Sequence, residues 1–558
     1  MSGRQARHGG AGDHSGPGGS VAGAVADQAD QAESVSGSLV DRAGSGSGSL
    51  VDRAGSGPGA WDAVVVGAGA AGLSAAWELT RAGMRPLLVE AGPEVGGLLR
   101  AGTVAGVRVD LGAESLVLRG EAVTQAVDDL GLELLAPAGG RSCLLVPEPG
   151  APERGWRSHP FPRDSYLGIP AAPLAEDVVS IIGQEAARRA AQDAQLPGEV
   201  GTGPHDPADL ASFVGARMGP GVVERLVDPI VTGIHGSPAS VLATQAVAPG
   251  LREATARLGS LQAAVAELVA TRSRRGGGAA ALAPRGGMFR LAEELRRAVE
   301  AAGGRVSTGT TVQWLRRGGG DSWSLGLAPT AEEAPRRAVS AGAVVLACPM
   351  AEALRLLTGV VDLDPGVAAR AGTPVSRLIV VARAAGLDDA PLGPGALVAD
   401  GRRGSPTADP DRAAVTALTH LSVKWPWIAQ ALREAHGEHV HALRLSYGRA
   451  GAAAGAAGRA GAPPVDLPRA LADIDKLTGV RIAAHEVIDS TRVIWQGRPP
   501  PATPERREGL DRLESAVAAV PGLAVTGEWV AGTGIAAVLT HARRRAAALT
   551  AAPGAPVG

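Results

Sequence analysis

The sequence is poor in the residues that usually surround large planar ligands, and it has no long apolar run. Aromatic residues make up 3% of the 558 residues, and no stretch of eighteen consecutive apolar residues occurs. A planar ligand would therefore meet mainly aliphatic side chains and backbone. The missing apolar run excludes a transmembrane helix from the expected fold. The N-terminus, MSGRQARHGG, also lacks the apolar core of a signal peptide.

Cysteine and net charge are scarce as well. The two cysteines, Cys143 and Cys348, stand in no C-x-x-C or zinc-like spacing. This predicts a reducing, cytoplasmic compartment and two buried thiols that only fill space. The formal net charge is −2, so neither nucleic acid nor an anionic membrane surface is an expected partner.

Glycine and proline are abundant instead, with 79 and 40 residues. Residues 1–59 consist largely of Gly, Ser, Ala and Asp, and the segment GSLVDRAGSG occurs there twice, at 37–46 and 48–57. Such a composition buries too little apolar surface to offset the entropy of ordering. We expect a disordered tail with a short duplication, because two copies are too few for a repeat fold.

The most informative stretch follows this tail, at residues 61–97. An apolar run ending at Val66 predicts a buried parallel strand. Gly67, Gly69 and Gly72 then form G-x-G-x-x-G where a helix is expected to begin. In dinucleotide-binding proteins these glycines allow a tight turn, close approach to the pyrophosphate, and close packing of helix on strand.

A second expected strand ends at Glu90, eighteen residues beyond Gly72. A carboxylate at this point can accept hydrogen bonds from both ribose hydroxyls of an adenosine. A glycine-rich turn without a ligand is the alternative. Gly96 and Gly97 follow almost at once, a continuation that resembles the flavin amine oxidase and protoporphyrinogen oxidase superfamily. The resemblance implies FAD rather than NAD.

The remaining chain alternates helical and strand patterns. We expect loops at 147–173 and 448–464, helices through 174–268, and a closing strand at 523–526 followed by a glycine turn and a helix. The expected fold is α/β, with a discontinuous Rossmann-like FAD-binding domain, a mixed-sheet substrate domain and a helical subdomain. The predicted parts are 1–59 as the tail, 60–135, 276–348 and 501–558 as the FAD-binding domain, 136–275 as a helical and substrate-binding region, and 349–500 as the substrate-binding domain.

Five motifs together resemble the protoporphyrinogen and coproporphyrinogen oxidases, which are FAD enzymes. Besides the opening glycines they are Gly112-Ala113-Glu114-Ser115, Asp228-Pro229 through Gly236, Gly286-Gly287-Met288, and the closing turn from Thr526 to Ile535. The segment from His420 to Pro426 contains a Lys-Trp-Pro sequence similar to the bacterial coproporphyrinogen branch, which is soluble. The chain's Ala-, Gly- and Arg-rich composition favours the same branch.

The resemblance assigns the FAD contacts to the phosphate turn, the ribose carboxylate, the flavin-facing segments, the adenine and the closing turn. The expected cofactor residues are Gly67, Ala68, Gly69, Ala70, Ala71, Gly72, Glu90, Gly97, Leu98, Gly112, Ala113, Glu114, Ser115, Val312, Glu528, Thr533, Gly534 and Ile535. Leu98 departs from the Lys, Arg or Trp that relatives often carry, and Glu114 from the arginine of some animal relatives.

The resemblance also implies a tetrapyrrole substrate with acidic propionates. Arg141 and Lys424 are the expected cations for these groups, and Leu397 an expected wall of the cavity, although Pro394 replaces a bulky aromatic residue of relatives. A propionate–arginine pair can be bidentate. A surface arginine and a solvated lysine are the plain alternatives. No residue is assigned as a catalytic base, because the flavin carries the difficult chemistry.

The expected reaction is the oxidation of coproporphyrinogen III to coproporphyrin III, with oxygen as acceptor, peroxide as product, and transient handover to a ferrochelatase. Protoporphyrinogen IX oxidation, an amine oxidase or carotenoid desaturase, and an inactive flavin- or porphyrin-binding protein are the alternatives. His436, His439 and His441 do not have the spacing of a metal site. Ser237 and Ser260 lack the context of a hydrolase nucleophile.

Overall fold

A computed structural model of the protein describes most of the chain. The described residues are 61–118, 120–147, 155–235, 237–274, 281–319, 322–329, 337–363, 367, 375–399, 415–447, 465–495 and 504–550. The predicted tail at 1–59 and the predicted loop at 448–464 lie outside these residues.

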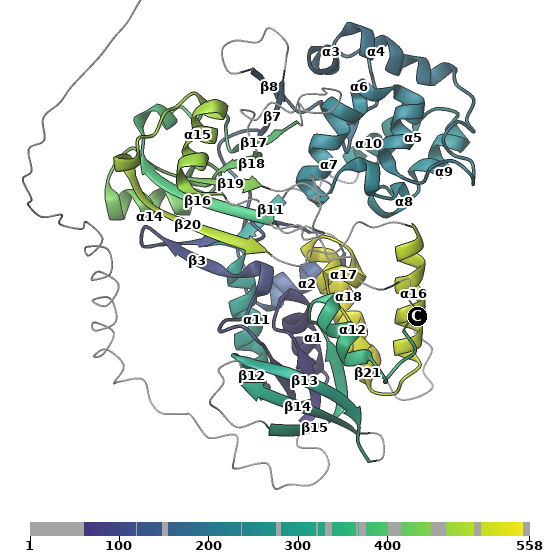
Figure 1. Ribbon diagram of the computed structural model, residues 1–558, viewed down its shortest axis with the longest axis vertical. Coiled ribbons are helices and arrows are strands. Elements are labelled where there is room, and N and C mark those ends of the chain that lie inside the picture. Colours follow the sequence, from purple (N-terminus) through teal and green to yellow (C-terminus); the bar gives the residue numbers. More distant parts are fainter. Residues whose placement is uncertain are drawn as a thin grey trace, which may run out of the picture. The chain divides into compact units, whose positions relative to one another are not determined.

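Three distant parts of the sequence build the first sheet (Figure 1). Its β12, β2, β1, β15 and β21 are parallel. The sheet is extended by β14, which is antiparallel to β15, and by β13, which is antiparallel to β14. Val66, Leu346 and Val525 are neighbours across β1, β15 and β21. The strands are β1 (Trp61–Val66), β2 (Pro86–Val89), β12 (Arg305–Ser307), β13 (Thr310–Arg317), β14 (Trp323–Pro329), β15 (Arg337–Leu346) and β21 (Leu523–Val525).

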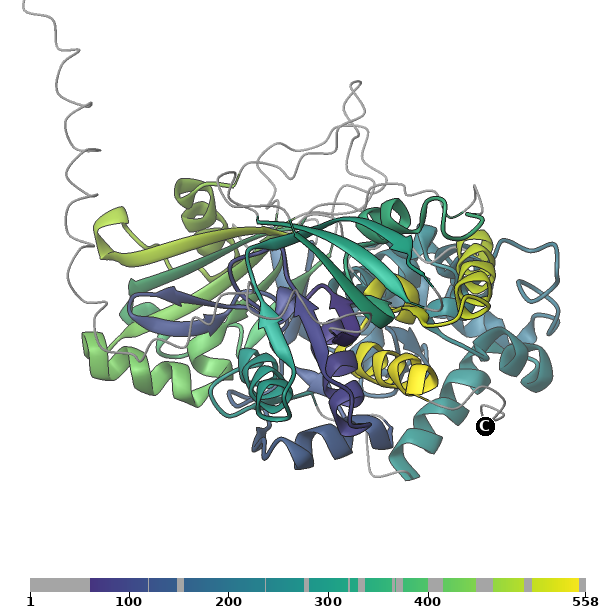
Figure 2. The same cartoon turned by 90° about the horizontal axis from the view of Figure 1, so that it is seen from below.

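Helices cover both faces of the first sheet because alternate side chains of β1 point to opposite sides. Ala63 and Val65 belong to one apolar cluster with α1 (Ala70–Arg81), α11 (Phe289–Ala301) and α18 (Ile535–Thr550). Val64 and Val66 belong to another with α12 (Met350–Leu357) and α16 (Pro504–Ala518). Figure 2 shows α18, in yellow, beside α1, in purple, and these two helices are in contact. The α/β fold predicted from the sequence is confirmed.

The second sheet is mixed and runs in the order β20-β16-β19-β18-β17-β7-β8. Only β17 and β7 pair in parallel, while the other neighbours are antiparallel. Its strands are β7 (Cys143–Pro147), β8 (Trp156–Pro160), β16 (Val375–Arg383), β17 (Gly395–Val398), β18 (Val415–His420), β19 (Val440–Tyr447) and β20 (Val487–Trp495). Two helices, α14 (Pro426–His436) and α15 (Leu467–Thr478), pack against this sheet.

A helical region lies between β10 (Ile169–Pro170) and β11 (Ala281–Pro284) in the sequence. It contains α3 (Glu176–Ile182), α4 (Gln184–Ala191), α5 (Leu210–Met218), α6 (Pro220–Val222), the π-helical η4 (Val223–Val227), α7 (Asp228–His235), α8 (Thr244–Val247), α9 (Leu251–Leu258) and α10 (Leu261–Arg274). In Figure 1 its helix α7 faces β17 and β18, and α7 contacts both strands.

One sequence-based expectation about the fold is wrong. Residues 147–173 were expected to form a loop, but this range holds β8 and the short hairpin of β9 (Ser165–Tyr166) and β10 (Ile169–Pro170). Proline is tolerated in β8 because this strand is at the edge of its sheet, where a missing N–H leaves no ladder bond unmade. The predicted domain boundaries stay predictions.

Candidate flavin site

The opening turn leaves room for a ligand directly beyond β1. The N–H of Gly67 donates to the Val89 carbonyl at 2.7 Å, and its φ of +99° favours glycine. A Cβ on Gly72 would collide with the Gly67 carbonyl, so only glycine lets α1 pack this closely. Gly69 has ordinary extended backbone, yet no heavy atom lies within 4 Å of a Cβ built there. This open position at the start of α1 suits a pyrophosphate.

The Glu90 carboxylate is held beside this opening. One oxygen accepts the N–H of Ala68 at 2.7 Å and the other accepts the N–H of Gly92 at 2.8 Å. Both contacts fix the carboxylate at the carboxyl end of β2, where the ribose of a dinucleotide is expected. The N–H of Thr310 donates to the Glu90 carbonyl at 2.8 Å, which brings the start of β13 to the same place.

Val312, predicted to contact the adenine through its backbone, lies two residues farther along β13. Its side chain is buried in the sheet, and its carbonyl accepts a hydrogen bond from Arg355 Nη2 at 2.8 Å. The half-exposed Arg355 side chain therefore already binds the Val312 carbonyl, at the place where the adenine is expected. An adenine contact by Val312 stays a prediction.

The second glycine pair leads the chain past the opening. The N–H of Gly96 donates to the Ala68 carbonyl at 2.7 Å, and η2 (Gly97–Leu99) follows. The Leu98 carbonyl accepts the N–H of Ala113 at 2.8 Å, and a Cβ on Gly112 would collide with that same carbonyl. The two flavin-facing segments predicted from the sequence therefore lie side by side. The Leu98 side chain is 38% exposed, so it adds an apolar surface to the site.

The C-terminal turn reaches the same edge of the first sheet. The N–H of Thr526 donates to the Leu346 carbonyl at 2.9 Å, and the N–H of Ala347 donates to the Val66 carbonyl at 2.8 Å. Glu528 begins α17 (Glu528–Ala531), and the predicted contact Ile535 begins α18. The structure thus brings the first and last of the predicted cofactor motifs together.

Glu114 is the buried centre of a charge cluster that we call the Glu114 cluster: Glu114, Arg377, Lys424 and Arg444. Its carboxylate is 2.6 Å from Arg444 Nη2 and 2.7 Å from Lys424 Nζ. Burial alone would raise the pKa of Glu114, but Arg444, Lys424 and Arg377 together lower it below its usual range. Arg377 and Arg444 also donate to the Gly112 carbonyl. The second sheet thereby holds the flavin-facing segment from behind.

The sequence analysis did not single out Arg377 or Arg444. Each is a charged residue next to apolar residues in a largely buried strand, Arg377 in β16 and Arg444 in β19. A buried arginine in such a strand needs a partner, so this pattern could have drawn attention to both residues.

Asp110 connects the flavin-facing strand to the predicted glycine turn before α11. Its two carboxylate oxygens accept the N–H groups of Met288, at 2.9 Å, and Phe289, at 3.0 Å. These are among the first N–H groups of α11, which lack partners within the helix. Burial raises the pKa of Asp110 to about 7. The contact explains why the Gly286-Gly287-Met288 motif accompanies the VDLGA strand.

A chain of contacts joins the predicted substrate residues to the flavin-facing segments. Beyond the Glu114–Lys424 pair, the Lys424 carbonyl accepts the N–H of Ala138 at 2.9 Å, close in sequence to the exposed Arg141. A Cβ on Gly393 would lie 2.9 Å from the Arg141 carbonyl, two residues before β17 begins. Lys424 and Arg141 are therefore brought to one neighbourhood by α13 (Leu421–Lys424) and β17.

The same chain of contacts continues to the C-terminal turn. Leu397 of β17 packs against Gly233 of α7, where even a Cβ would be too close. At the end of α7, His235 Nδ1 is 3.1 Å from the Thr533 hydroxyl. Thr533 is a predicted cofactor residue, so α7 connects the predicted substrate wall to the cofactor turn. Ile234, beside His235, is 53% exposed and adds apolar surface here.

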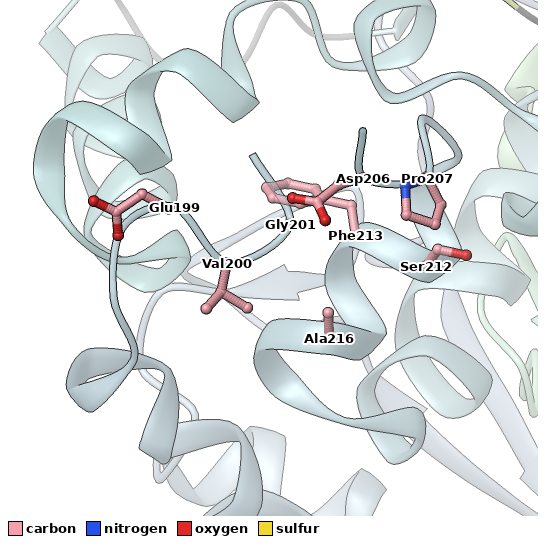
Figure 3. Close-up of a pocket in the computed structure, with 8 residues that line it drawn as sticks. All are labelled: Glu199, Val200, Gly201, Asp206, Pro207, Ser212, Phe213 and Ala216. Carbon is pink, nitrogen blue, oxygen red and sulfur yellow. The ribbon is translucent and has the colours of Figure 1, made fainter. Parts of the chain in front are cut away.

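A separate pocket lies in the helical region (Figure 3). It has a volume of about 380 Å³ and is lined by the loop around Val200 and Asp206 and by Phe213 of α5. None of its lining residues is a predicted site residue. Glu199 and Asp206 are the carboxylates at this pocket, so it offers no cation to an acidic ligand.

The histidines considered for a metal site form a different arrangement. His439 and His441 both hydrogen-bond to Asp388, and His441 also contacts His420 at 3.0 Å. Burial, followed by His441, lowers the pKa of His420 to about 3. In the described part of the chain no group of three or more metal-ligating side chains is arranged to hold an ion. No described helix is both long and apolar enough to cross a membrane.

Comparison with curated proteins shows similarity to coproporphyrinogen III oxidases. The chain is 32% identical over 192 residues to the enzyme of Propionibacterium freudenreichii, covering 34% of each chain. It is 32% identical over 200 residues to that of Mycobacterium tuberculosis, covering 35% of this chain and 41% of the relative. The match therefore spans only about a third to two fifths of these relatives' own length.

Comparison with solved structures supports the fold. A protein from Exiguobacterium sp. 255-15, described as a candidate protoporphyrinogen oxidase, aligns with a TM-score of 0.67 at 20% identity. The alignment covers 88% of this chain and 99% of that one. At this identity the likeness concerns the fold alone.

The family comparison covers part of the region that carries the site, including Glu90, Leu98 and Gly112. A model of the family described as flavin containing amine oxidoreductase matches residues 70–390, more than half of the chain. The predictions of a flavin oxidoreductase, of FAD as its cofactor and of a resemblance to porphyrinogen oxidases are confirmed by these matches. The open Gly69 position, the fixed Glu90 carboxylate and the paired segments at Leu98 and Gly112 fit such a cofactor. The chain belongs to the flavin containing amine oxidoreductase family.

Proposed function

We propose that this protein is an FAD-dependent porphyrinogen oxidase, with coproporphyrinogen III as the substrate and molecular oxygen as the acceptor. The Glu114 cluster carries the proposal: three cations surround one carboxylate directly behind the segment expected to face the flavin. An excess of positive charge favours a substrate with several carboxylates. The similarity to coproporphyrinogen III oxidases supports the same substrate class.

In this proposal the chain's own residues bind and orient. Gly69 would give the pyrophosphate access to the backbone, Glu90 would accept hydrogen bonds from the ribose, and Gly112 and Ala113 would run beside the ring. Bound FAD supplies the hydride-accepting chemistry. Arg141 and Lys424 are proposed to bind propionates, and Leu397 is proposed to form part of the cavity wall.

Molecular oxygen completes the balance of the proposed reaction. Oxidation of a porphyrinogen to a porphyrin releases six electrons and six protons, and three oxygen molecules take up both to give three molecules of peroxide. The pyrrole N–H protons can leave to solvent, so no side chain is needed as a dedicated base. Handover of the product to a ferrochelatase and a cytoplasmic location stay predictions.

The charge of the site argues against the amine oxidase alternative. A protonated amine approaching the Glu114 cluster would meet three cations and a single carboxylate, which disfavours its binding. Protoporphyrinogen IX stays an alternative substrate because it has the same reduced ring and is also acidic. It differs in carrying two propionates rather than four. A rate comparison between the two porphyrinogens distinguishes these substrates.

The test uses the purified full-length chain loaded with FAD. We expect coproporphyrinogen III to become fluorescent with release of peroxide, faster than protoporphyrinogen IX, and no turnover of putrescine or benzylamine. An FAD-loaded chain that oxidises only amines, or that binds FAD and turns over none of these compounds, would overturn the proposal.

Variants locate the substrate cations in the same assay. Arg141→Gln and Lys424→Met should each raise the KM for coproporphyrinogen III by about tenfold, the effect of one charge-assisted contact. Arg481→Gln, which changes an exposed arginine after α15, serves as the matched control. Unchanged KM values in both site variants would remove these two residues from the substrate site.

A further inference from the structure

A buried hydrogen-bonded series lies behind the C-terminal cofactor turn. Thr526 Oγ1 is 2.9 Å from His541 Nδ1, and His541 Nε2 is 2.8 Å from Glu514 Oε1. The three side chains come from three parts of the chain: the residue directly after β21, the middle of α18 and the buried face of α16. Thr526 has no exposed surface, His541 is 7% exposed and Glu514 is 8% exposed.

The series connects the two ends of the C-terminal turn. Thr526 is the last residue that the first sheet holds, through its N–H to the Leu346 carbonyl. Ile535 begins α18, and His541 lies on the same helix. The Thr526–His541 hydrogen bond therefore joins the residue before the turn to the helix that starts after it. The enclosed residues, 527–534, include the predicted cofactor contacts Glu528, Thr533 and Gly534.

The partners of His541 define its tautomer. An ionised Glu514 can only accept, so His541 Nε2 carries the proton of that hydrogen bond. In the neutral ring Nδ1 then accepts from the Thr526 hydroxyl, which fixes both the ring and the threonine rotamer. Arg545 contacts the same Glu514 oxygen, and Arg507 lies 3.9 Å from the other. These two arginines keep the carboxylate charged and in place.

A carboxylate, an imidazole and a hydroxyl in series are also the groups of a hydrolytic triad. That function is excluded here because the Thr526 side chain is completely buried and cannot reach a substrate. The series also differs from an ordinary surface cap, because every member is buried and has its partner. Its remaining consequence is geometric: it determines where residues 527–534 lie.

We propose that Thr526, His541 and Glu514 are positioning residues that hold the C-terminal turn in the geometry that binds FAD. The proposal goes beyond the substrate assignment, because it concerns cofactor binding and does not depend on which compound is oxidised. It predicts that a methyl in place of the Thr526 hydroxyl weakens FAD binding even though this hydroxyl is buried away from the cofactor.

The test measures FAD affinity of the apo-protein by flavin fluorescence, with no substrate present. Thr526→Val keeps the shape of the side chain and removes the hydroxyl, and we expect a Kd for FAD about tenfold higher, the effect of one buried hydrogen bond. Thr526→Ser restores the hydroxyl and should restore the Kd to within about twofold. The rise in melting temperature on addition of FAD should shrink in Thr526→Val and recover in Thr526→Ser.

Two further variants separate positioning from general stability. Glu514→Gln keeps the size of the side chain but removes the charge that holds His541, and should also raise the Kd. Glu508→Gln changes an exposed carboxylate on the same helix and should leave the Kd unchanged. If Thr526→Val lowers the melting temperatures of the apo- and FAD-bound forms equally, with an unchanged Kd, the series is only structural and the proposal is wrong. If Thr526→Val does not fold, Glu514→Gln decides the question by the same criteria.

Discussion

Lys424 Nζ lies 2.7 Å from Glu114 Oε2, across 310 residues of sequence. One residue was expected at the substrate and the other at the flavin, and the structure makes them an ion pair. The pair is buried on the side of Glu114 and half-buried on the side of Lys424. It therefore connects the second sheet mechanically and electrostatically to the segment that faces the cofactor.

The two partners should contribute unequally to stability. Glu114→Gln leaves Arg444 and Lys424 without their carboxylate in a buried site, and we expect the free energy of unfolding to fall by about 3 kcal/mol. Lys424→Met leaves Glu114 paired with Arg444, and a fall of about 1.5 kcal/mol is expected. Urea unfolding of the FAD-bound chain measures both. Equal losses of unfolding free energy in the two variants would show that Arg444 does not balance the charge of Glu114 when Lys424 is replaced.

Gly69→Ala should separate folding from cofactor binding. The backbone at Gly69 has φ −76°, which alanine adopts, and the added methyl meets no protein atom. The melting temperature of the apo-protein should therefore change little, whereas the methyl should occupy space needed by the pyrophosphate and raise the Kd for FAD at least about tenfold.

Gly319→Ala, at an equally open position in a loop, is the control for this change and should leave both quantities unaltered. Gly72→Ala should behave oppositely to Gly69→Ala. Its Cβ would collide with the Gly67 carbonyl, so the apo-protein itself should be destabilised. If the Gly69→Ala variant binds FAD with an unchanged Kd, the pyrophosphate does not bind at Gly69.

The helical region depends on one completely buried ion pair. Arg217 Nε is 2.5 Å from Asp193 Oδ1, neither side chain is exposed, and the Arg217 guanidinium also donates to the carbonyls of Pro197, Val200 and Gly259. Arg217→Met should lower the free energy of unfolding by about 4 kcal/mol, because Asp193 is left charged and buried. Thermal or urea unfolding checks this value.

Replacing both partners, as Arg217→Met with Asp193→Leu, should recover part of the loss, because no unpaired charge remains. Arg257→Ala, which removes an exposed pair with Glu267, should produce no measurable change. Arg217→Met with wild-type stability would contradict the assignment of this pair as the centre of the helical region.

Glu514 should make stability depend on acid pH. Burial alone would raise its pKa, but the hydrogen bonds from His541 and Arg545 lower it from 4.5 to about 2. The folded protein thus binds this proton less tightly than the unfolded chain. The resulting stability is present above about pH 4.5 and is lost as the pH falls from 4.5 towards 2.

The difference in unfolding free energy between the wild type and Glu514→Gln isolates this contribution from other carboxylates. It should be constant above about pH 4.5 and should diminish below that value. A difference that stays constant down to pH 3 would show that the contacts with His541 and Arg545 do not lower the pKa of Glu514.

Local sequence patterns were sufficient to predict an α/β fold that binds a dinucleotide, and the resemblance to a known superfamily implied that the dinucleotide is FAD. The valines of β1, the glycines at 67, 69 and 72, and Glu90 act within 30 residues of one another, so their spacing alone predicts their geometry. Helices were also predicted through 174–268, and α3 to α9 lie within that range. The strands β17 and β20 were not predicted, because a short glycine-containing strand and a half-exposed edge strand give weak alternating patterns.

Only the folded chain reveals how these parts act together. Arg377 and Arg444 reach Gly112 from strands more than 260 residues away, and no local pattern encodes a contact over that separation. The same is true of the Thr526–His541–Glu514 series, whose members come from three parts of the chain. Periodicity specifies which side of a helix or strand is buried, whereas the partner of a buried charge is decided by the packing of one element against another.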